Sequence, residues 1–155
     1  MFAQRSRVET FAEFFATNEP KLRESLMATL GGDAGCDAAA EAFEYGWANW
    51  DRVIAMDNPV GYLYKVGRSR GRRKARRKRP RFDTFEASRL PDVEPKLPWA
   101  LSRLSERQRV VVILVHCHQW TQSEVGDWLG VSRSSVQNHL ERAMASLRKS
   151  IGGVS

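Results

Sequence analysis

Four polar side chains near the C-terminus have the types and spacing of a surface that hydrogen-bonds nucleic-acid bases. They are Arg133, Ser134, Gln137 and Asn138, and their separations place them on one face of a helix. Their amide, hydroxyl and guanidinium groups can reach base edges and phosphates. The chemistry indicated is therefore recognition rather than the making or breaking of bonds.

Two short helices joined by a tight turn, over residues 121–141, would position this face. Thr121 and Glu124 form a capping box, and Gly130 suits a helix end in the left-handed conformation. Ser132 caps the second helix. The residues expected to face inward are Val125, Trp128, Leu129, Val131, Val136 and Leu140. This pattern is typical of a helix-turn-helix, whose second helix lies in the DNA major groove, and an ordinary helical hairpin is the alternative.

The positive charge of the chain is concentrated in one segment. Ten Lys or Arg and no acid lie between Arg68 and Arg81, whereas the whole chain of 155 residues carries +7, so the remainder carries −3. A local cationic patch favours a polyanion, and nucleic acid is the simplest candidate. A hydrophobic content of 42% is enough for one ordinary domain or two small ones.

The other reactive side chains indicate neither catalysis nor metal binding. No carboxylate cluster, Ser-His-Asp set, Walker loop or metal-ligand spacing is recognisable, so we expect a protein that is not an enzyme and needs no cofactor. Adjacent residues of His116-Cys117-His118 would point about 100° apart on a helix, which argues against a metal site. Cys36 and Cys117 are interpreted as buried thiols.

Neither a signal peptide nor a membrane span is indicated. The first fifteen residues lack a sufficiently long apolar run, and no run approaches the length that spans a bilayer. We therefore expect a cytoplasmic protein without membrane insertion.

The helical period of the apolar residues predicts an all-α fold, beginning with one helix before residue 31. Thr10 and Glu13 have the spacing of a capping box, Pro20 should end or kink this helix, and Gly31-Gly32 should stop it.

The next helix is predicted to have one apolar and one acidic face. Asp33 and Asp37 offer caps, and a continuous buried face would contain Phe43, Trp47, Trp50 and Ile54. The opposite face, the acidic strip, consists of Glu41, Glu44, Ala48 and Asp51. By itself this helix favours a merely solvated strip over a protein-docking surface.

A third helix should begin at Asn58-Pro59, with Asn as the cap and Pro at the first helical position. Val60, Leu63 and Val66 or Gly67 would face inward. The basic flank, on another side of this helix, consists of Lys65, Arg68, Arg72 and Arg76 with Ser69 beside them. Its continuation to Arg79 should fray into an arm, for which DNA contact is favoured over a localisation signal or a solubilising tail.

Composition divides the chain into two helical domains. Residues 8–79 form the first, residues 80–97 a flexible proline-rich linker, and residues 98–151 the second. Ser105 and Gln108 form another capping box. The run from Val110 to Val115 has the β-branched content of a strand, but the cap before it and the helix-turn-helix after it require a helix.

The whole arrangement resembles a bacterial sigma-70 family factor of the short extracytoplasmic-function (ECF) class. The run A-L-S-R-L-S-E-R-Q-R-V-V-V-I-L, followed by S-E-V-G-D-W-L-G-V-S-R-S-S-V-Q-N-H-L-E-R, is similar to that family's region 4. The runs A-A-E-A-F-E-Y-G-W-A-N-W and D-N-P-V-G-Y-L-Y-K-V-G-R are similar to its region 2. No segment resembles region 1.1 or region 3, which fits the short class.

The resemblance implies a non-catalytic promoter-specificity subunit of RNA polymerase, located in the cytoplasm and associated with the nucleoid. The acidic strip would contact the β′ clamp coiled coil, region 4 would contact the β flap, and an anti-sigma factor would be a usual regulator. The −35 element would be read by Arg133, Ser134, Gln137 and Asn138. The −10 region would be contacted by Asp57, Asn58, Tyr62, Lys65, Arg68, Ser69, Arg72 and Arg76, with a flipped base received by the loop 55–58.

Three departures from the family pattern accompany this interpretation. Ser69 replaces a usual Asn, Gly126 replaces a usual Ala, and the basic arm is longer than usual. In the helix-turn-helix pattern itself, His139 lies where an aliphatic residue is expected. Two other functions stay open at this point. The first is a stand-alone helix-turn-helix regulator, although no dimerisation seam is evident. The second is an enzyme acting on nucleic acid, which would need catalytic residues that converge only in space.

Overall fold

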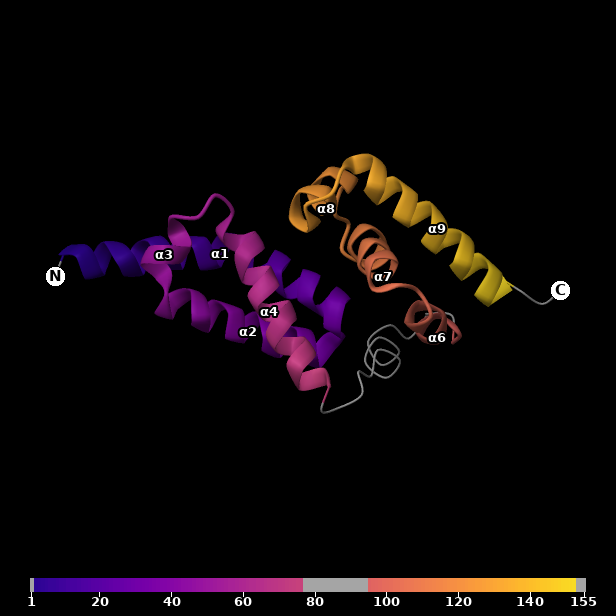
Figure 1. Cartoon of the computed structure of the whole chain (residues 1–155), viewed down its shortest axis with the longest axis horizontal. Coiled ribbons are helices and arrows are strands. Elements are labelled where there is room, and N and C mark those ends of the chain that lie inside the picture. Colours follow the sequence, from indigo (N-terminus) through magenta and orange to yellow (C-terminus); the bar gives the residue numbers. More distant parts are fainter. Residues whose placement is uncertain (1, 77–94, 153–155) are drawn as a thin grey trace. The chain divides into compact units, whose positions relative to one another are not determined.

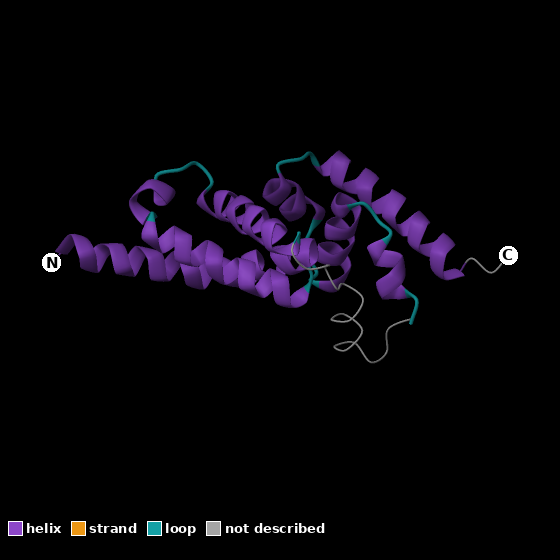
Figure 2. Ribbon diagram, turned by 60° about the horizontal axis from the view of Figure 1, so that its bottom comes forward, coloured by secondary structure: helices purple, strands orange, loops and turns teal. Residues whose placement is uncertain are grey.

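The computed structural model of the chain describes residues 2–76 and 95–152. Every regular element in these two ranges is a helix, which confirms the predicted all-α fold (Figures 1 and 2). The chain divides into two compact units, Met1–Arg79 and Pro80–Ser155, called unit 1 and unit 2 below. Most of the predicted linker and the end of the basic arm lie outside the described residues, so the domain boundaries at 8–79, 80–97 and 98–151 stay predictions.

The first helix of unit 1 is longer than the sequence predicted. Helix α1 (Phe2–Leu30) continues through both Thr10 and Pro20. The Thr10 hydroxyl caps nothing: it donates to the Ser6 carbonyl (2.9 Å) and accepts the indole N–H of Trp50 (3.1 Å). The prediction of a helix start at Thr10 is therefore wrong, and of the two outcomes predicted for Pro20 the helix end does not occur. Packing against the other helices of the unit stabilises both segments of α1. The helix stops before Gly31-Gly32, as predicted.

The second helix also begins earlier than predicted. Gly31, at φ 94°, is the only residue between α1 and α2 (Gly32–Ala48), and its N–H bonds the Met27 carbonyl (2.9 Å). Asp33 and Asp37 lie inside α2 and are not caps. Asp33 nevertheless lies in the first turn, where its negative charge complements the helix dipole.

Helices α1, α2 and α4 (Pro59–Ala75) pack against one another around the core of unit 1. Leu22, Leu26, Val53 and Leu63 are fully buried there. The predicted apolar face of the second helix is interrupted after Ala48, because the short helix α3 (Trp50–Ile54) begins two residues later. Trp50 is 1% exposed but Ile54 is 46% exposed, so the prediction that Ile54 is buried is wrong.

The start of α4 agrees with the sequence. The Asn58 side-chain oxygen accepts the N–H of Gly61 (3.1 Å), and Pro59 occupies the first turn, where its missing N–H removes no helical bond. A short loop between α3 and α4 precedes this cap (Figure 2).

In unit 2, the helices α6 (Leu97–Ser102), α7 (Glu106–Val112) and α8 (Gln122–Leu129) all contact the long helix α9 (Arg133–Gly152). The Ser105–Gln108 capping box is present, and residues 110–114 are buried and helical as predicted. Helix α7 passes into a wider π-helical turn, η1 (Ile113–Cys117). Cys117 at the end of this turn is exposed and Cys36 is half-buried, so neither thiol is buried as predicted.

Candidate nucleic-acid interface

The turn of the helix-turn-helix has the predicted geometry. At the start of α8, the Thr121 hydroxyl accepts the Glu124 N–H (3.0 Å) and the Glu124 carboxylate accepts the Thr121 N–H (3.1 Å). Gly130 ends the helix at φ 71° and ψ 34°, the left-handed conformation that favours glycine. Both ends of α8 are therefore fixed by local interactions.

Gly126 allows the turn to close tightly on α8. A Cβ atom at this position would lie 2.8 Å from the Val131 carbonyl oxygen, and the Val131 N–H in turn bonds the Gly126 carbonyl (2.9 Å). The close approach of the two backbones explains glycine here.

Helix α9 presents the four predicted recognition residues at its N-terminal end. Ser132 caps the helix by accepting the Ser135 N–H (3.1 Å). Val136 and Leu140, on the inner face of the same helix, are buried. Arg133, Ser134 and Asn138 are exposed, and the half-buried Gln137 donates to Glu141 (2.8 Å). The first two turns of α9 thus offer polar groups to a ligand.

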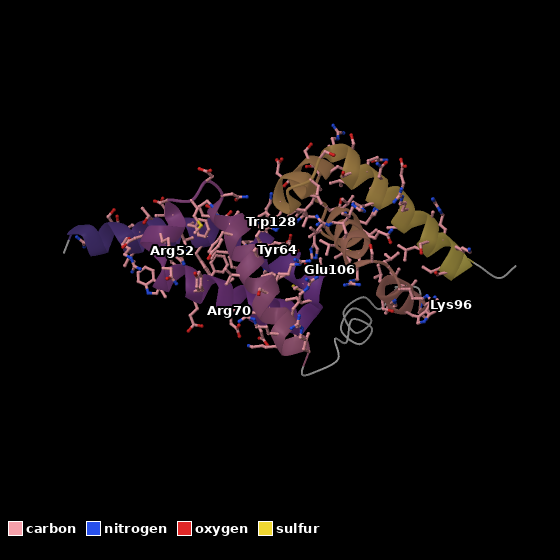
Figure 3. The ribbon with its side chains drawn as sticks, viewed as in Figure 1. Arg52, Tyr64, Arg70, Lys96, Glu106 and Trp128 are labelled. Atoms are coloured by element: carbon pink, nitrogen blue, oxygen red, sulfur yellow. The ribbon has the colours of Figure 1, made fainter. Side chains whose placement is uncertain are left out.

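Two side chains of the helix-turn-helix, Trp128 and His139, are half-buried. Trp128, labelled in Figure 3, packs edge-on against Trp120 with ring centroids 5.2 Å apart. His139 on α9 is half-buried, as its position at the inner edge suggested. Burial, followed by the charges of Arg107 and Arg142, lowers the pKa of His139 and favours its neutral form.

The basic flank of α4 is largely open to solvent. Lys65, Ser69, Arg72 and Arg76 are exposed and Arg68 is half-buried. Burial, and then the like charges of Arg68 and Arg76, lower the pKa of Arg72. This repulsion indicates that the three guanidinium groups share one region of the surface, as a phosphate-binding face requires.

The loop before α4 places Asp57 and Asn58 at the surface, next to the N-terminal end of the same helix. The Asn58 side-chain oxygen is occupied by the helix cap. The Asn58 amide nitrogen is not used by this cap and could donate to a ligand.

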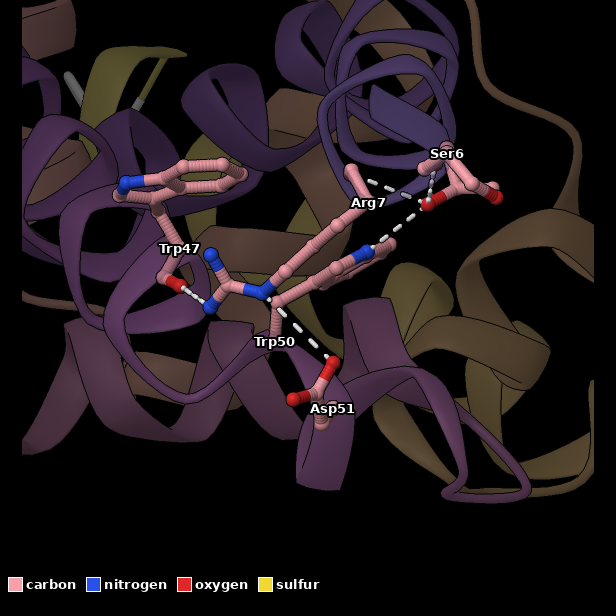
Figure 4. A network of polar contacts seen from close by, with 6 residues as sticks. Ser6, Arg7, Trp47, Trp50 and Asp51 are labelled. Atoms are coloured by element: carbon pink, nitrogen blue, oxygen red, sulfur yellow. Dashed lines mark hydrogen bonds and ion pairs between the residues drawn. The ribbon is translucent and has the colours of Figure 1, made fainter. Parts of the chain in front are cut away.

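The acidic strip is open at its centre and ion-paired at both ends. Glu44 and Ala48 are exposed, whereas Glu41 on α2 pairs with Lys74 on α4. At the other end, the Asp51 carboxylate lies 3.6 Å from Nε of Arg7 (Figure 4).

Arg7 is a contact that the sequence did not indicate. Its guanidinium lies 4.3 Å from the Trp47 ring centroid and donates to the Trp47 carbonyl (2.6 Å), near the C-terminal end of α2 (Figure 4). A cation suits the negative end of the helix dipole, so Arg7 joins α1 to α2 beside the acidic strip.

A second unpredicted group surrounds Tyr62. Tyr45, Arg52, Tyr62 and Arg70, here called the tyrosine–arginine cluster, come from α2, α3 and α4. Hydrogen bonding with Tyr45, followed by that with Arg52, lowers the pKa of Tyr62. Of the four residues, only Tyr62 was among the predicted site residues.

Comparison with known proteins finds a family match within unit 2. Residues 100–149 match the family model of sigma-70 region 4. The helix-turn-helix, the Ser105–Gln108 cap and the π-helical turn all lie within the matched residues.

The whole chain is similar to ECF sigma factors. Two curated relatives, the ECF RNA polymerase sigma factor SigG of two Mycobacterium tuberculosis strains, are each 29% identical over 155 aligned residues. The alignment covers 95% of this chain and 36% of each relative, so the chain spans about a third of their length.

A solved structure shares the fold of the chain. It is the co-crystal structure of the sigma factor RpoE in complex with the anti-sigma factor NepR from Bartonella quintana. The match has a TM-score of 0.59 and 16% sequence identity, and it covers 95% of this chain and 99% of that one. At this identity, the likeness concerns the fold alone.

Two features are absent from the described residues. Within 2–76 and 95–152, no three or more His, Cys, Asp or Glu side chains are grouped as metal ligands would be. No helix in these ranges is both long enough and apolar enough to cross a bilayer.

Proposed function

We propose that this chain is a promoter-specificity subunit of bacterial RNA polymerase, of the ECF class, acting in the cytoplasm at the nucleoid. The observation that carries the proposal is the capped helix-turn-helix within a sigma-70 region 4, which presents Arg133, Ser134 and Asn138 at the exposed start of α9. The same chain carries a helical unit with a basic flank and an acidic strip. The proposed role is non-catalytic.

Each surface has one role in this proposal. The start of α9, including Gln137, reads the −35 element, and the basic flank with Tyr62 lies against the −10 element. The loop 55–58 receives an unpaired base, which returns part of the free energy spent on opening the duplex. The acidic strip binds the β′ clamp coiled coil, region 4 binds the β flap, and an anti-sigma factor regulates access to these surfaces.

The proposal also accounts for the division of the chain into two units. Phosphate contacts alone give binding that is weak and sensitive to salt. When both units are held on the polymerase, the second promoter contact becomes intramolecular, so neither unit needs high affinity by itself. A stand-alone regulator would instead need a dimer on paired half-sites, and no observation favours that alternative.

The test is co-purification with core RNA polymerase from a nuclease-treated bacterial lysate, followed by in vitro transcription from a pool of genomic fragments. Stoichiometric core and new, discrete start sites are expected, and the start sites would supply the promoter motif. Sequence-specific DNA binding without any association with core would overturn the proposal and favour the stand-alone regulator.

One charge reversal tests the acidic strip directly. Glu44→Arg should weaken the affinity for core, because it replaces an exposed carboxylate at the centre of the strip by a cation and so reverses the charge offered to the partner. Glu13→Arg, at an exposed position of α1, is the matched control. Equal affinities of the two variants for core would remove the acidic strip from the interface.

A further inference from the structure

One flank of α1 carries apolar side chains that the packing of unit 1 leaves exposed. Among the described residues, Val8 and Phe15 are two of the four exposed large hydrophobic side chains, with exposed fractions of 49% and 41%. Ala12 lies between them in the sequence and is also exposed. Single exposed apolar residues are ordinary, but apolar residues that adjoin on one face of a helix indicate a contact with another molecule.

The spacing of these residues is that of a coiled-coil seam. Together with a charged residue at each end, they follow one another at alternating intervals of three and four residues, which places them all on one face of the helix. This set, called the α1 seam below, consists of Arg5, Val8, Ala12, Phe15 and Glu19. Arg5 is exposed and Glu19 is half-buried. The sequence analysis did not reveal the seam, because a helix that began at Thr10 would exclude Arg5 and Val8.

Other side chains hold α1 in unit 1, so the seam is open to a partner. Phe11 and Phe14 pack on Trp50, with ring centroids 5.2 and 5.0 Å away. Arg7 contacts Trp47 closer to the N-terminus. The beginning of α1 extends past the neighbouring helices of the unit (Figures 1 and 2). A partner would therefore meet a helix that is already formed, and no free energy would be spent on ordering it.

The charges at the two ends of the α1 seam favour a second copy of the chain in the antiparallel orientation. Arg5 and Glu19 each lie seven residues from Ala12, which is about 10.5 Å along the helix. A two-fold axis at Ala12 therefore brings Arg5 of one copy to Glu19 of the other, and this ion pair forms twice. Val8 lies beside Phe15 of the other copy. Parallel pairing would instead set like charges against each other at both ends.

We infer that two copies of this chain pair through their α1 seams, antiparallel and related by a two-fold axis. The small side chain of Ala12 lets the two helices approach closely where they cross. A seam of this length buries less surface than a permanent dimer needs, so the pairing is reversible and depends on concentration.

This pairing goes beyond the proposed function, which assigns no role to the α1 seam. The seam lies in unit 1 and the recognition helix in unit 2. Pairing through α1 therefore does not by itself set the spacing of two recognition helices, which a regulator on paired half-sites requires.

The experiment is sedimentation velocity of the full chain at physiological ionic strength. From the micromolar range to about 0.5 mM, a monomer should give way to a dimer. Arg5→Glu sets carboxylates against each other at both ends of the seam, and Glu19→Arg does the same with guanidinium groups. Each single variant should weaken the dimer about ten-fold or more, because two attractive pairs become repulsive.

Two combinations should restore the dimer. An equal mixture of Arg5→Glu and Glu19→Arg should form a mixed dimer, because each variant supplies the charge that the other requires at both ends. The chain that carries both changes should pair with itself like the parent chain. Restoration by either route also shows that the variants are folded, although Glu19→Arg loses the ion pair with Arg23 (2.9 Å).

Two further variants separate the seam from the rest of α1. Glu13→Arg reverses an exposed charge away from the seam and should leave the dimer unchanged. Val8→Ser, at an exposed position, should weaken the dimer about five-fold or more, because one apolar side chain is lost from each copy. A chain that stays monomeric up to about 0.5 mM would overturn the inference. So would a dimer that is unaffected by both single charge reversals, or single variants that do not pair with each other.

Discussion

Gly35 lies where α1 and α2 approach most closely, and its replacement by alanine should destabilise unit 1. A Cβ atom on Gly35 would lie 2.4 Å from both the Cα and the N of Met27, and 2.6 Å from the carbonyl carbon of Leu26. All three atoms belong to the backbone of α1, so no side-chain rotation can relieve the contact. The two helices would have to separate by about 1 Å to restore ordinary contact.

The cost of this separation can be estimated. Overpacking a core costs about 1–3 kcal/mol, and a backbone clash belongs at or above the upper end of that range. A radial gap of about 1 Å also removes about a quarter to a half of the attractive energy of each dispersion contact across the interface. Alanine recovers about 1 kcal/mol through its higher helix propensity. Gly35→Ala should therefore destabilise unit 1 by about 2 kcal/mol or more.

Hydrogen exchange read by mass spectrometry reports on each unit separately. The slowest amides of α1, α2 and α4 should exchange about 30-fold faster in Gly35→Ala, whereas those of unit 2 should not change. Gly46→Ala, whose Cβ would be 3.1 Å from a movable Leu63 methyl, should have a smaller effect. Gly152→Ala has no atom within 4 Å and should have none. Unchanged or slower exchange in Gly35→Ala would refute the reasoning.

Three further predictions concern unit 2. Arg133→Ala should weaken binding to the −35 element by about 1–3 kcal/mol in a footprinting titration if Arg133 contacts a base, and equal loss on a scrambled element would make it a phosphate contact. Gly130→Ala should destabilise unit 2 by about 1–2 kcal/mol in urea unfolding, whereas Gly130→Asn should cost less because Asn tolerates the left-handed conformation. The pKa of His139 is lowered from 6.5, so the unfolded chain takes up this proton at higher pH than the folded unit. Unit 2 should therefore lose stability as the pH falls below about 6.5, the ordinary pKa of histidine, and His139→Gln should flatten that slope in urea titrations at several pH values.

The sequence predicted best those features that depend on a few adjacent residues. The capping boxes at Thr121 and Ser105, the Asn58 cap and the left-handed Gly130 are each decided within one helical turn, and all four are present. The helical state of residues 110–114 was also correct, because the neighbouring cap and turn outweighed the β-branched composition.

The same local rules failed where distant residues decide the outcome. Thr10 and Glu13 have the spacing of a capping box, but Trp50 bonds Thr10 and α1 runs past it. Pro20 lacks an amide hydrogen, yet the helix continues because its following turns are buried in the core of unit 1. The π-helical turn that exposes Cys117 has no pattern in the sequence that would reveal it.

The residues of the candidate site likewise include some that helical spacing predicted and some that it missed. The recognition residues of α9 and the basic flank follow from helical spacing, and the structure leaves most of them exposed, while their contacts with DNA stay predictions. The partners of Tyr62 could not be found by spacing, because Tyr45 and Arg52 lie on other helices. Arg7 was missed for the same reason: its partners are about forty residues away in the sequence.

The ion pair between Glu41 and Lys74 makes the acidic strip and α4 thermodynamically dependent on each other. If a basic partner pairs with Glu41, Lys74 loses its ion pair and becomes available to a phosphate. Binding of a DNA phosphate by Lys74 would likewise leave Glu41 available to the partner. Linkage requires the two effects to be equal in size. An exposed pair contributes at most about 1 kcal/mol, so polymerase and DNA would each raise the affinity for the other by up to about five-fold.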